Sequence, residues 1–434
     1  MDIATTLALV LLFGVVTLLA LGAPIAIGIG LASAAAMMVG LGPENGMQTS
    51  AQRMFTGTTS FTLLAIPFFI LAGVIMNNGG ISRRLVDAAK VLSGRLPGSL
   101  AHTNVVANMM FGSISGSGVA SAAAVGGTMG PMQAKEGYRA EFSAATNIAS
   151  APAGLLIPPS NTLIVYSLVS GTSIAALFLA GYLPGILWGL ATMVVVAVYA
   201  WRRKLKAQSP GSLRAGLKVL LDAVPSLLLI VIVIGGIVGG VFTATEGSAI
   251  AVVYALLLSF VYRTIKVREL PSILIESTKI TAAVMILIGV SSIMSWVMSY
   301  AGIPDLIAST LLGITDNTVM ILILMNIVLL LVGTFMDPTP AVLIFTPIFL
   351  PIALGFGMDP VHFGIMIVFN LCIGTITPPV GPVLFVGARI AGLRIESVIR
   401  SLLPYFAVLV ATLMVVTFVP ALSLWLPGVA GLMP

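Results

Sequence analysis

Long apolar runs recur along almost the whole chain, and they constrain the fold more than any other feature. A helix needs about 20 residues to cross the ~30 Å hydrocarbon core of a bilayer. With 59% hydrophobic and 8% charged residues among 434, the chain has more apolar surface than a water-soluble fold could cover. The sequence therefore predicts an all-α, polytopic membrane protein with uninterrupted spans at about 4–20, 23–41, 59–78, 174–201, 224–243, 246–262, 280–300 and 404–426.

Four further apolar stretches are interrupted near their centres. Residues 140–170 are broken by Pro158-Pro159, and residues 360–388 by Pro378-Pro379. Two others carry Gly, Ser, Thr or Pro at their centres: 97–134 and 317–356. Irregular backbone at membrane depth is tolerated only where protein covers it or where it lines a polar cavity. We therefore interpret the proline-broken pair as discontinuous helices and the other pair as re-entrant helical hairpins.

The basic residues indicate the orientation of the chain. If the 202–218 loop is cytoplasmic and each hairpin enters and leaves on one side, every Lys and Arg except Arg53 falls on the cytoplasmic side. Reading either hairpin as a single crossing would destroy this bias. The net charge of +6 is therefore a topology signal, and it predicts lipid surroundings and no nucleic-acid partner.

The two halves of the chain repeat each other. Gly154 and the prolines after it recur 220 positions later as Gly374 and its prolines, while Gly80 matches Gly302 and Asn104 matches Asn326 at a spacing of 222. The single span 174–201 inverts the second copy in the membrane. Inverted repeats with broken helices at corresponding positions are typical of secondary transporters and of their midplane sites.

The repeat divides the chain into four predicted parts. They are a first inverted repeat (1–171), a linking transmembrane helix with a basic cytoplasmic loop (172–222), a second inverted repeat (223–392), and a C-terminal amphipathic stretch with the last transmembrane helix (393–434). Amphipathic stretches at 80–95 and 264–279 are either interfacial loop helices or arms that connect a moving part to a fixed part.

The interruptions place polar groups near the membrane midplane. The hairpin centres read Gly112-Ser-Ile-Ser-Gly-Ser-Gly118 and Gly333-Thr-Phe-Met-Asp-Pro-Thr-Pro340. A broken helix leaves free carbonyls suited to a cation and free amides suited to an anion, and hard oxygen ligands suit sodium. Because no Lys or Arg lies in the hairpins or the breaks, an anionic substrate would need a co-bound cation.

Two acidic residues lie in hydrophobic surroundings. Asp337 is predicted near the midplane, where a carboxylate costs about 2.5–3.5 kcal/mol and is usually functional. It can coordinate an ion, cap the following half-helix, or do both. Glu246 either has a role inside the membrane or lies at a turn between two spans.

At these residues the chain resembles the large membrane subunit (DctM/SiaM-type) of tripartite ATP-independent periplasmic transporters, over almost its whole length. The motifs that carry the resemblance are Phe111–Ala124, Gly137-Tyr138, Ile157-Pro-Pro-Ser160, Thr243-Ala-Thr-Glu246, Met358–Gly364 and Gly374–Gly381. The resemblance implies an elevator mechanism, with Na⁺ as the coupling ion and no other cofactor or transition metal. It also implies a bacterial inner-membrane location, a small membrane subunit (Q-type) and an extracytoplasmic substrate-binding protein (P-type) as partners.

The same resemblance implies roles for individual residues. The resemblance implies substrate contact by Ser115, Ser160 and Asp337, and the polar groups beside the interruptions add Ser117 and Asn161 as candidate substrate-binding residues. The implied sodium-binding residues are Ser113, Ser115, Gly116, Gly154, Gly333, Thr334, Asp337, Thr375 and Thr377. The chain departs from the usual pattern at Gly118, where the family often has Ser, and at Asn161, which is usually apolar. A more polar and roomier pocket favours sialic acid or another sugar acid over a C4-dicarboxylate.

One alternative is barely separated by the sequence, and the other function classes fit it less well. A stand-alone sodium–anion symporter would share the architecture and need no binding protein. An intramembrane enzyme would need a motif such as His-Glu-x-x-His, and the two histidines are distant. No lysine follows a glycine, so the chain has no ATP-binding phosphate loop. A channel would not need an inverted repeat with two hairpin sites.

Overall fold

The computed structural model describes residues 3–94, 96–205, 213–315 and 317–433, and in these ranges the chain forms helices and no strand. A helix satisfies its own backbone hydrogen bonds, which is why an apolar run adopts it away from water. With η marking a 3-10 turn, the elements are α1 (Ile3–Ala20), α2 (Ile25–Leu41), α3 (Pro43–Thr58), η1 (Phe61–Leu64), α4 (Ala65–Asn78), α5 (Ile81–Ser93), α6 (Ser99–Ser115), α7 (Gly118–Lys135), α8 (Ala140–Ser150), η2 (Ala151–Leu155), α9 (Asn161–Ser170), α10 (Ile174–Arg203), α11 (Leu213–Val238), α12 (Ala244–Val261), η3 (Val267–Glu269), α13 (Leu270–Tyr300), α14 (Ile303–Ile314), α15 (Thr318–Gly333), α16 (Pro338–Gly355), α17 (Pro360–Gly374), α18 (Pro382–Ile390), α19 (Ile395–Phe418) and α20 (Ala421–Val429).

The prediction of a multi-pass membrane protein is confirmed. Within the described ranges, seven helical stretches are long and apolar enough to cross a membrane: Phe61–Asn78, Ile174–Arg203, Gly216–Val238, Ala244–Val261, Val267–Tyr300, Pro338–Gly355 and Ile395–Phe418. The predicted spans 4–20 and 23–41 form α1 and α2, which contact each other and have 18 and 17 residues.

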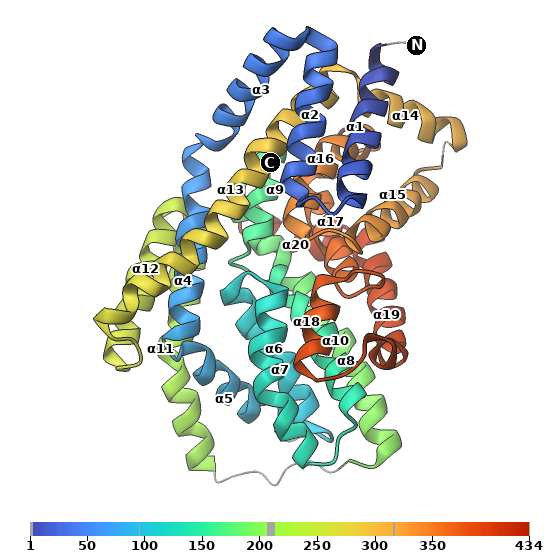
Figure 1. The fold of residues 1–434 in the computed structure, drawn as a ribbon. Coiled ribbons are helices and arrows are strands. Elements are labelled where there is room, and N and C mark those ends of the chain that lie inside the picture. Colours follow the sequence, from blue (N-terminus) through green and yellow to red (C-terminus); the bar gives the residue numbers. More distant parts are fainter. Residues whose placement is uncertain (1–2, 95, 206–212, 316, 434) are drawn as a thin grey trace.

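Two groups of helices make up the molecule (Figure 1). The scaffold group contains α1–α4 and α11–α13; in it α13 contacts α2, α3 and α4, and α12 contacts α4 and α11. The hairpin group contains α6–α10 and α15–α20; in it α6 contacts α7 and α8, and α17 contacts α15, α16 and α19. Two helices connect the groups along the chain: α5 links α4 to α6, and α14 links α13 to α15.

The predicted interruptions coincide with real breaks in the helices. α6 and α7 form one helical hairpin, and α15 and α16 form the other. The stretch 140–170 is divided into α8, η2 and α9, and the stretch 360–388 into α17 and α18; the double prolines lie between the two parts, with cis bonds at Pro158-Pro159 and Pro378-Pro379. The helix starts at 118 and 338 and those at 140 and 360 preserve the spacing of 220.

The arm of the second half is not where we predicted it. α5 and α14 each begin directly after a glycine in the left-handed region, Gly80 with φ +70° and Gly302 with φ +64°. An L-residue is strained at such angles, so glycine marks both turns. The counterpart of 80–95 is therefore α14, which the sequence analysis did not predict as a helix.

The prediction of a separate amphipathic element at 264–279 is wrong. After the short turn η3, one helix of 31 residues, α13, runs without interruption to Tyr300. Pro271 is in the first turn, where proline is tolerated. No Gly or Pro follows before Gly289, so nothing in the sequence ends the helix at residue 280, where the predicted span began.

The last predicted span, 404–426, is also wrong as a single helix. α19 already begins at Ile395 and ends at Phe418, and α20 begins at Ala421. Pro420 lies between them; it has no N–H and restricts the backbone of Val419. The amphipathic stretch expected before this span is the first part of α19.

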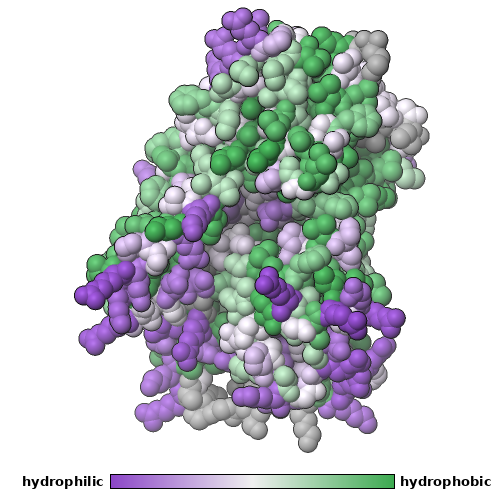
Figure 2. Space-filling model, in the orientation of Figure 1, coloured by the Kyte–Doolittle hydropathy of each residue, from purple (hydrophilic) through white to green (hydrophobic). Residues whose placement is uncertain are grey.

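Hydrophilic residues gather over the lower end of the molecule, while hydrophobic residues dominate the region above it (Figure 2). The end of α10 and the start of α11 lie at this lower end in Figure 1. We call it the basic end, because α5 and the end of α10 bring charged side chains there: Arg83, Arg84, Lys90, Arg202 and Arg203.

Candidate functional site

A cavity of about 620 Å³ lies between the scaffold group and the hairpin group. On the hairpin-group side it is lined by the tips of both helical hairpins and by residues of η2, α9 and α18 near the two breaks. A volume of this order suits a small organic molecule. From the predicted site the cavity contains Ser115, Gly116, Ser117, Asn161, Asp337 and Thr375.

The tip of the first hairpin is a tight turn between α6 and α7. Gly116 has φ +61° there, and the Ser117 hydroxyl oxygen accepts a hydrogen bond of 3.2 Å from the N–H of Ala120, which caps α7. Asn161 lies against this tip, since a Cβ added at Gly116 would be 2.7 Å from its Nδ2. The first hairpin and the start of α9 thus form one polar corner of the cavity, and Ser115 lies at the same corner.

The tip of the second hairpin places a carboxylate in the cavity. Asp337 is the N-cap of α16, and its Oδ1 accepts a 3.2 Å hydrogen bond from the N–H of Thr339. Pro338 is at the first helical position. It has no N–H, so no backbone donor is left unsatisfied there. The N–H and the side chain of Thr339 both hydrogen-bond to this carboxylate, which has about four lone pairs. The capping role that the sequence suggested for Asp337 is present, and the remaining oxygen lone pairs are open to a cation or a polar ligand.

Glycine pairs hold each hairpin against its broken helix. A Cβ added to Gly154 would lie 2.2 Å from the Cα of Gly112, and one added to Gly374 would lie 2.4 Å from the Cα of Gly333. Such distances leave no room for a side chain in either half. The backbone of each hairpin therefore touches the backbone of the break, which brings the polar tips close to the free helix ends.

The second hairpin is also hydrogen-bonded to its break. The N–H of Gly381 donates to the carbonyl of Thr334 at 2.8 Å, and the N–H of Val383 donates to the carbonyl of Thr375 at 3.1 Å. These bonds satisfy amides at the start of α18 that would otherwise lack partners. The first of them also ties together two segments that contain predicted sodium-binding residues.

The predicted sodium ligands lie at helix ends in both halves. The hydroxyls of four of them donate to a carbonyl of the preceding turn: Ser113 to Met110, Thr334 to Leu331, Thr375 to Cys372 and Thr377 to Ile373. A hydroxyl that donates its proton in this way keeps oxygen lone pairs for a cation. Gly154 and Gly333 are buried at the glycine contacts. These residues thus offer hard oxygen ligands, and their role in binding sodium remains a prediction.

Ser160 lies apart from the other predicted substrate contacts. It is fully buried and does not line the cavity. Its hydroxyl donates to the carbonyl of Leu155, and its oxygen accepts from the N–H of Leu163 at 3.3 Å. Ser160 is therefore the N-cap of α9, which orients the neighbouring Asn161.

Glu246 is a helix-capping residue. Its carboxylate accepts from the N–H of Thr243 at 2.8 Å, and its own N–H donates to the Thr243 hydroxyl at 3.3 Å. This is a capping box at the start of α12. Of the two readings of Glu246, the structure supports the turn between spans.

Matching polar clusters lie below each hairpin tip. Asn108 donates to the side-chain oxygens of Asn104, Asn147 and Ser150 at 2.8–3.0 Å. In the second half, Asn370 donates to the side-chain oxygen of Asn326 at 2.8 Å. Buried amide pairs of this kind fix the position of one helix against another.

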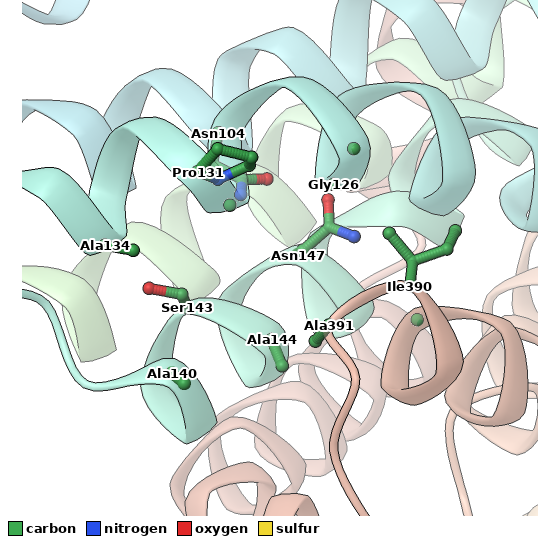
Figure 3. Close-up of a pocket in the computed structure, with 13 residues that line it drawn as sticks. Asn104, Gly126, Pro131, Ala134, Ala140, Ser143, Ala144, Asn147, Ile390 and Ala391 are labelled. Carbon is green, nitrogen blue, oxygen red and sulfur yellow. The ribbon is translucent and has the colours of Figure 1, made fainter.

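A smaller cavity of about 270 Å³ lies beside the first of these clusters (Figure 3). α7 contributes Gly126, Gly127 and Gly130 to its wall, and α8 contributes Ser143 and Asn147. None of the residues predicted to bind substrate or sodium lines it. Since the glycines have no side chains, the cavity is a consequence of the small residues in α7, and it reaches the polar cluster rather than the candidate site.

The scaffold-group side of the large cavity was missed by the sequence analysis. It is formed by α4 and α13 and includes three polar residues: Asn77, Glu276 and Lys279. From the sequence, Lys279 was predicted to matter only for topology. A contact between residues 200 positions apart has no local sequence signal, so only the assembled fold could reveal it.

A family model places this architecture among known proteins. It describes the DctM component of the tripartite ATP-independent periplasmic transporters, and it matches residues 12–422. The chain belongs to the DctM family. It is therefore a subunit of a membrane transporter and not an enzyme, and with its apolar spans it is a multi-pass protein of the inner membrane.

Relatives agree with this membership, and a solved structure shares the fold. The chain is 55% identical to the uncharacterized protein YgiK of Salmonella typhimurium, over 98% of the chain and 99% of the relative. It is 41% identical to the C4-dicarboxylate large permease DctM of Pseudomonas aeruginosa (92% and 93%) and 38% identical to the sialic acid large permease SiaM of Vibrio cholerae (96% and 97%). A crystal structure of the Alcanivorax borkumensis YdaH transporter shares the fold, with a TM-score of 0.63 at 16% identity over 90% of this chain and 91% of that one.

Proposed function

We propose that this DctM-family chain takes up a small organic anion across the inner membrane by sodium-coupled secondary transport. The observation that carries the proposal is the convergence of both hairpin tips and both helix breaks on one cavity, with Asp337 and several hydroxyl groups in its wall. Helix ends and hydroxyls can hold an anion, and carboxylate and carbonyl oxygens can hold Na⁺. The bound cation would offset the negative charge of Asp337, which otherwise repels an anion.

The two-group architecture supports an elevator mechanism. The residues that would bind substrate and sodium all belong to the hairpin group, while the opposite wall belongs to the scaffold group. If the hairpin group moves as a unit and α5 and α14 bend, the site reaches each side of the membrane in turn. The glycine contacts and buried amide pairs of the hairpin group would keep the site intact during that movement.

The substrate class follows from the cavity and from the relatives. Relatives are named for a C4-dicarboxylate and for sialic acid, both of which are organic acids. Asn161 adds an amide to the polar corner, and Gly118 adds no side chain beside it. This larger and more polar corner favours a sugar acid such as sialic acid over a C4-dicarboxylate.

Two partners belong to the proposal. We expect a small membrane subunit and an extracytoplasmic substrate-binding protein that delivers the anion. The specific alternative is a stand-alone symporter of the same architecture, which would work without the delivery protein.

Uptake in proteoliposomes tests the proposal. The chain would be reconstituted with its small subunit and supplied with the binding protein, and radiolabelled succinate and N-acetylneuraminate would be compared under an inward sodium gradient and an equal potassium gradient. We expect uptake of one anion only with sodium and only with the binding protein. Uptake that persists without the binding protein would favour the symporter, and uptake that is equal in potassium would refute sodium coupling.

A further inference from the structure

The scaffold wall of the large cavity is apolar over most of its length and polar at one end. Ile66, Ile70 and Val74 line it from α4, and Ile280, Val284 and Leu287 line it from α13. Their spacing of three, four or seven residues places them on one face of each helix. Beyond these apolar residues the same two faces end in polar groups, with Asn77 on α4 and Glu276 and Lys279 on α13.

The polar end of this wall faces the basic end of the molecule. α4 ends one residue after Asn77 and leads into α5, whose first turns carry Arg83 and Arg84. α13 begins shortly before Glu276, directly after η3, the turn that Lys266 precedes. From Leu287 to Glu276 the wall extends roughly 16 Å along α13, at 1.5 Å per residue. The cavity therefore reaches from the hairpin tips to the ends of two scaffold helices at the basic end.

Among the described residues that line this cavity, Lys279 is the only basic one. Two acidic residues line it as well, Glu276 on the scaffold wall and Asp337 on the hairpin wall. Among the described residues Lys279 forms an ion pair with neither, although Glu276 is only three positions away. Its side chain is exposed, so its three N–H donors are available to a ligand.

We propose that Lys279 and Asn77 form an anion subsite at the mouth of the cavity, which receives the carboxylate of the substrate as it leaves the hairpin tips toward the basic end. This inference rests on the proposed function, since it assigns the exit of the same anion. Lys279 attracts the anion away from the site near Asp337. Glu276, one turn away, weakens that attraction and so keeps the anion from being retained there.

The subsite is fixed on the scaffold group, whereas the predicted binding residues belong to the hairpin group. When the hairpin group moves, the two sets of ligands separate. Lys279 therefore contacts the anion only while the cavity opens beside the lower part of α13. Its effect on anion binding is confined to one side of the membrane. A general effect on folding or on lipid anchoring would be seen from both sides.

Exchange assays from each side test this inference. The complex would be reconstituted with a known orientation, and the half-saturating concentration of the transported anion would be measured with the anion supplied either at the basic end or at the opposite face. For Lys279→Gln we expect an increase of about threefold to tenfold at the basic end and no change at the opposite face, as for one partly screened charge. Lys279→Arg should restore the wild-type value within about twofold. Glu276→Gln should lower the value at the basic end by about twofold.

Lys266→Gln is the matched control, because it removes a charge from the same end of the molecule but does not line the cavity. It should leave both values unchanged. The Lys279→Gln effect should also shrink at high salt, since exposed charges are screened. Equal changes on both faces, or an equal effect of Lys266→Gln, would overturn the subsite and indicate a role of Lys279 in anchoring. If the wild-type complex shows no sodium-driven uptake, the proposed function fails; if it does and Lys279→Gln resembles wild type, only this inference fails.

Discussion

At the scale of single residues, the structure separates capping from ligand binding. Asp337, Ser117 and Ser160 are all helix N-caps, but only the first two also line the cavity. A cap that faces a cavity has two functions, and a substitution can remove one and leave the other. This makes the roles of these residues testable one at a time.

Asp337→Asn should abolish sodium-dependent uptake while the protein stays folded. Asparagine caps a helix about as well as aspartate, so α16 keeps its start, whereas the negative charge that a cation needs is lost. We expect uptake to fall at least about tenfold with little change in melting temperature. Asp359→Asn is the matched control: Asp359 caps α17, accepting from Val361 at 2.7 Å, and does not line the cavity, so its variant should transport normally. Equal uptake by Asp337→Asn and the wild type would exclude an ionic role.

Ser115→Ala and Ser160→Ala should have opposite signatures. Ser115 lines the cavity, so its loss should raise the KM for the anion several-fold with little effect on stability. Ser160 is a buried cap, so its loss should lower the free energy of unfolding by about 1 kcal/mol and change KM less. Uptake kinetics and thermal unfolding of both purified variants check this. A KM effect confined to Ser160→Ala would restore the substrate role that the sequence suggested.

These residues show how much of the candidate site could be predicted from the sequence. The Gly, Ser and Asp motifs predicted a polar meeting point, and Ser115, Ser117, Asn161 and Asp337 do share one cavity. The sequence could not place Ser160, because a serine after a double proline serves equally as a cap or as a ligand. The position of Lys279 in the cavity wall could not be predicted for a different reason: the cavity exists only where two distant segments of the chain meet.

At the scale of helices, glycine contacts hold the hairpins in place. Gly154→Ala and Gly374→Ala should both prevent correct assembly, because each added methyl group meets backbone atoms closer than 2.5 Å. We expect loss of the folded protein in detergent, measured by size-exclusion chromatography. Gly127→Ala is the control: among the described residues, nothing outside its own helix turn lies within 4 Å of a Cβ added there, and alanine favours a helix over glycine by about 1 kcal/mol. A well-folded Gly154→Ala variant would contradict the close contact.

The helices also show where sequence patterns were ambiguous. Breaks marked by Pro-Pro or by Gly-rich turns were found, because these residues restrict the backbone locally. Two helices, α3 and α14, were missed, since α3 is polar over much of its length and α14 is short. The repeat pairs Gly80 with Gly302. Because a helix follows Gly80, this pairing predicts a helix after Gly302 as well, which is where α14 lies.

At the scale of the whole molecule, the elevator mechanism predicts alternating exposure of the cavity. In a Cys372→Ala background, which removes the single cysteine, Ser117→Cys should react with a membrane-impermeant thiol reagent from the basic end in one state and from the opposite face in the other. Saturating sodium and anion should change the ratio of the two rates. Thiol labelling followed by mass spectrometry would measure both.

Thr56→Cys is the control for that experiment. Thr56 is exposed on α3, a helix of the scaffold group that lies away from the basic end (Figure 1), and should react from one face only, whatever the sodium concentration. If Ser117→Cys also reacts from a single face under every condition, the hairpin group does not carry the site across the membrane.

The length of α13 has a consequence for how the two faces of the membrane communicate. Its lower part carries Lys279, and its upper part carries Trp296, over which the guanidinium of Arg53 on α3 lies at 5.3 Å. These positions are 17 residues apart on one uninterrupted helix, roughly 25 Å. Because a continuous helix moves as a rigid element, a tilt of α3 that shifts Trp296 would also displace Lys279. Under the proposed function, a protein that pressed on α3 would alter anion release at the basic end without touching the anion.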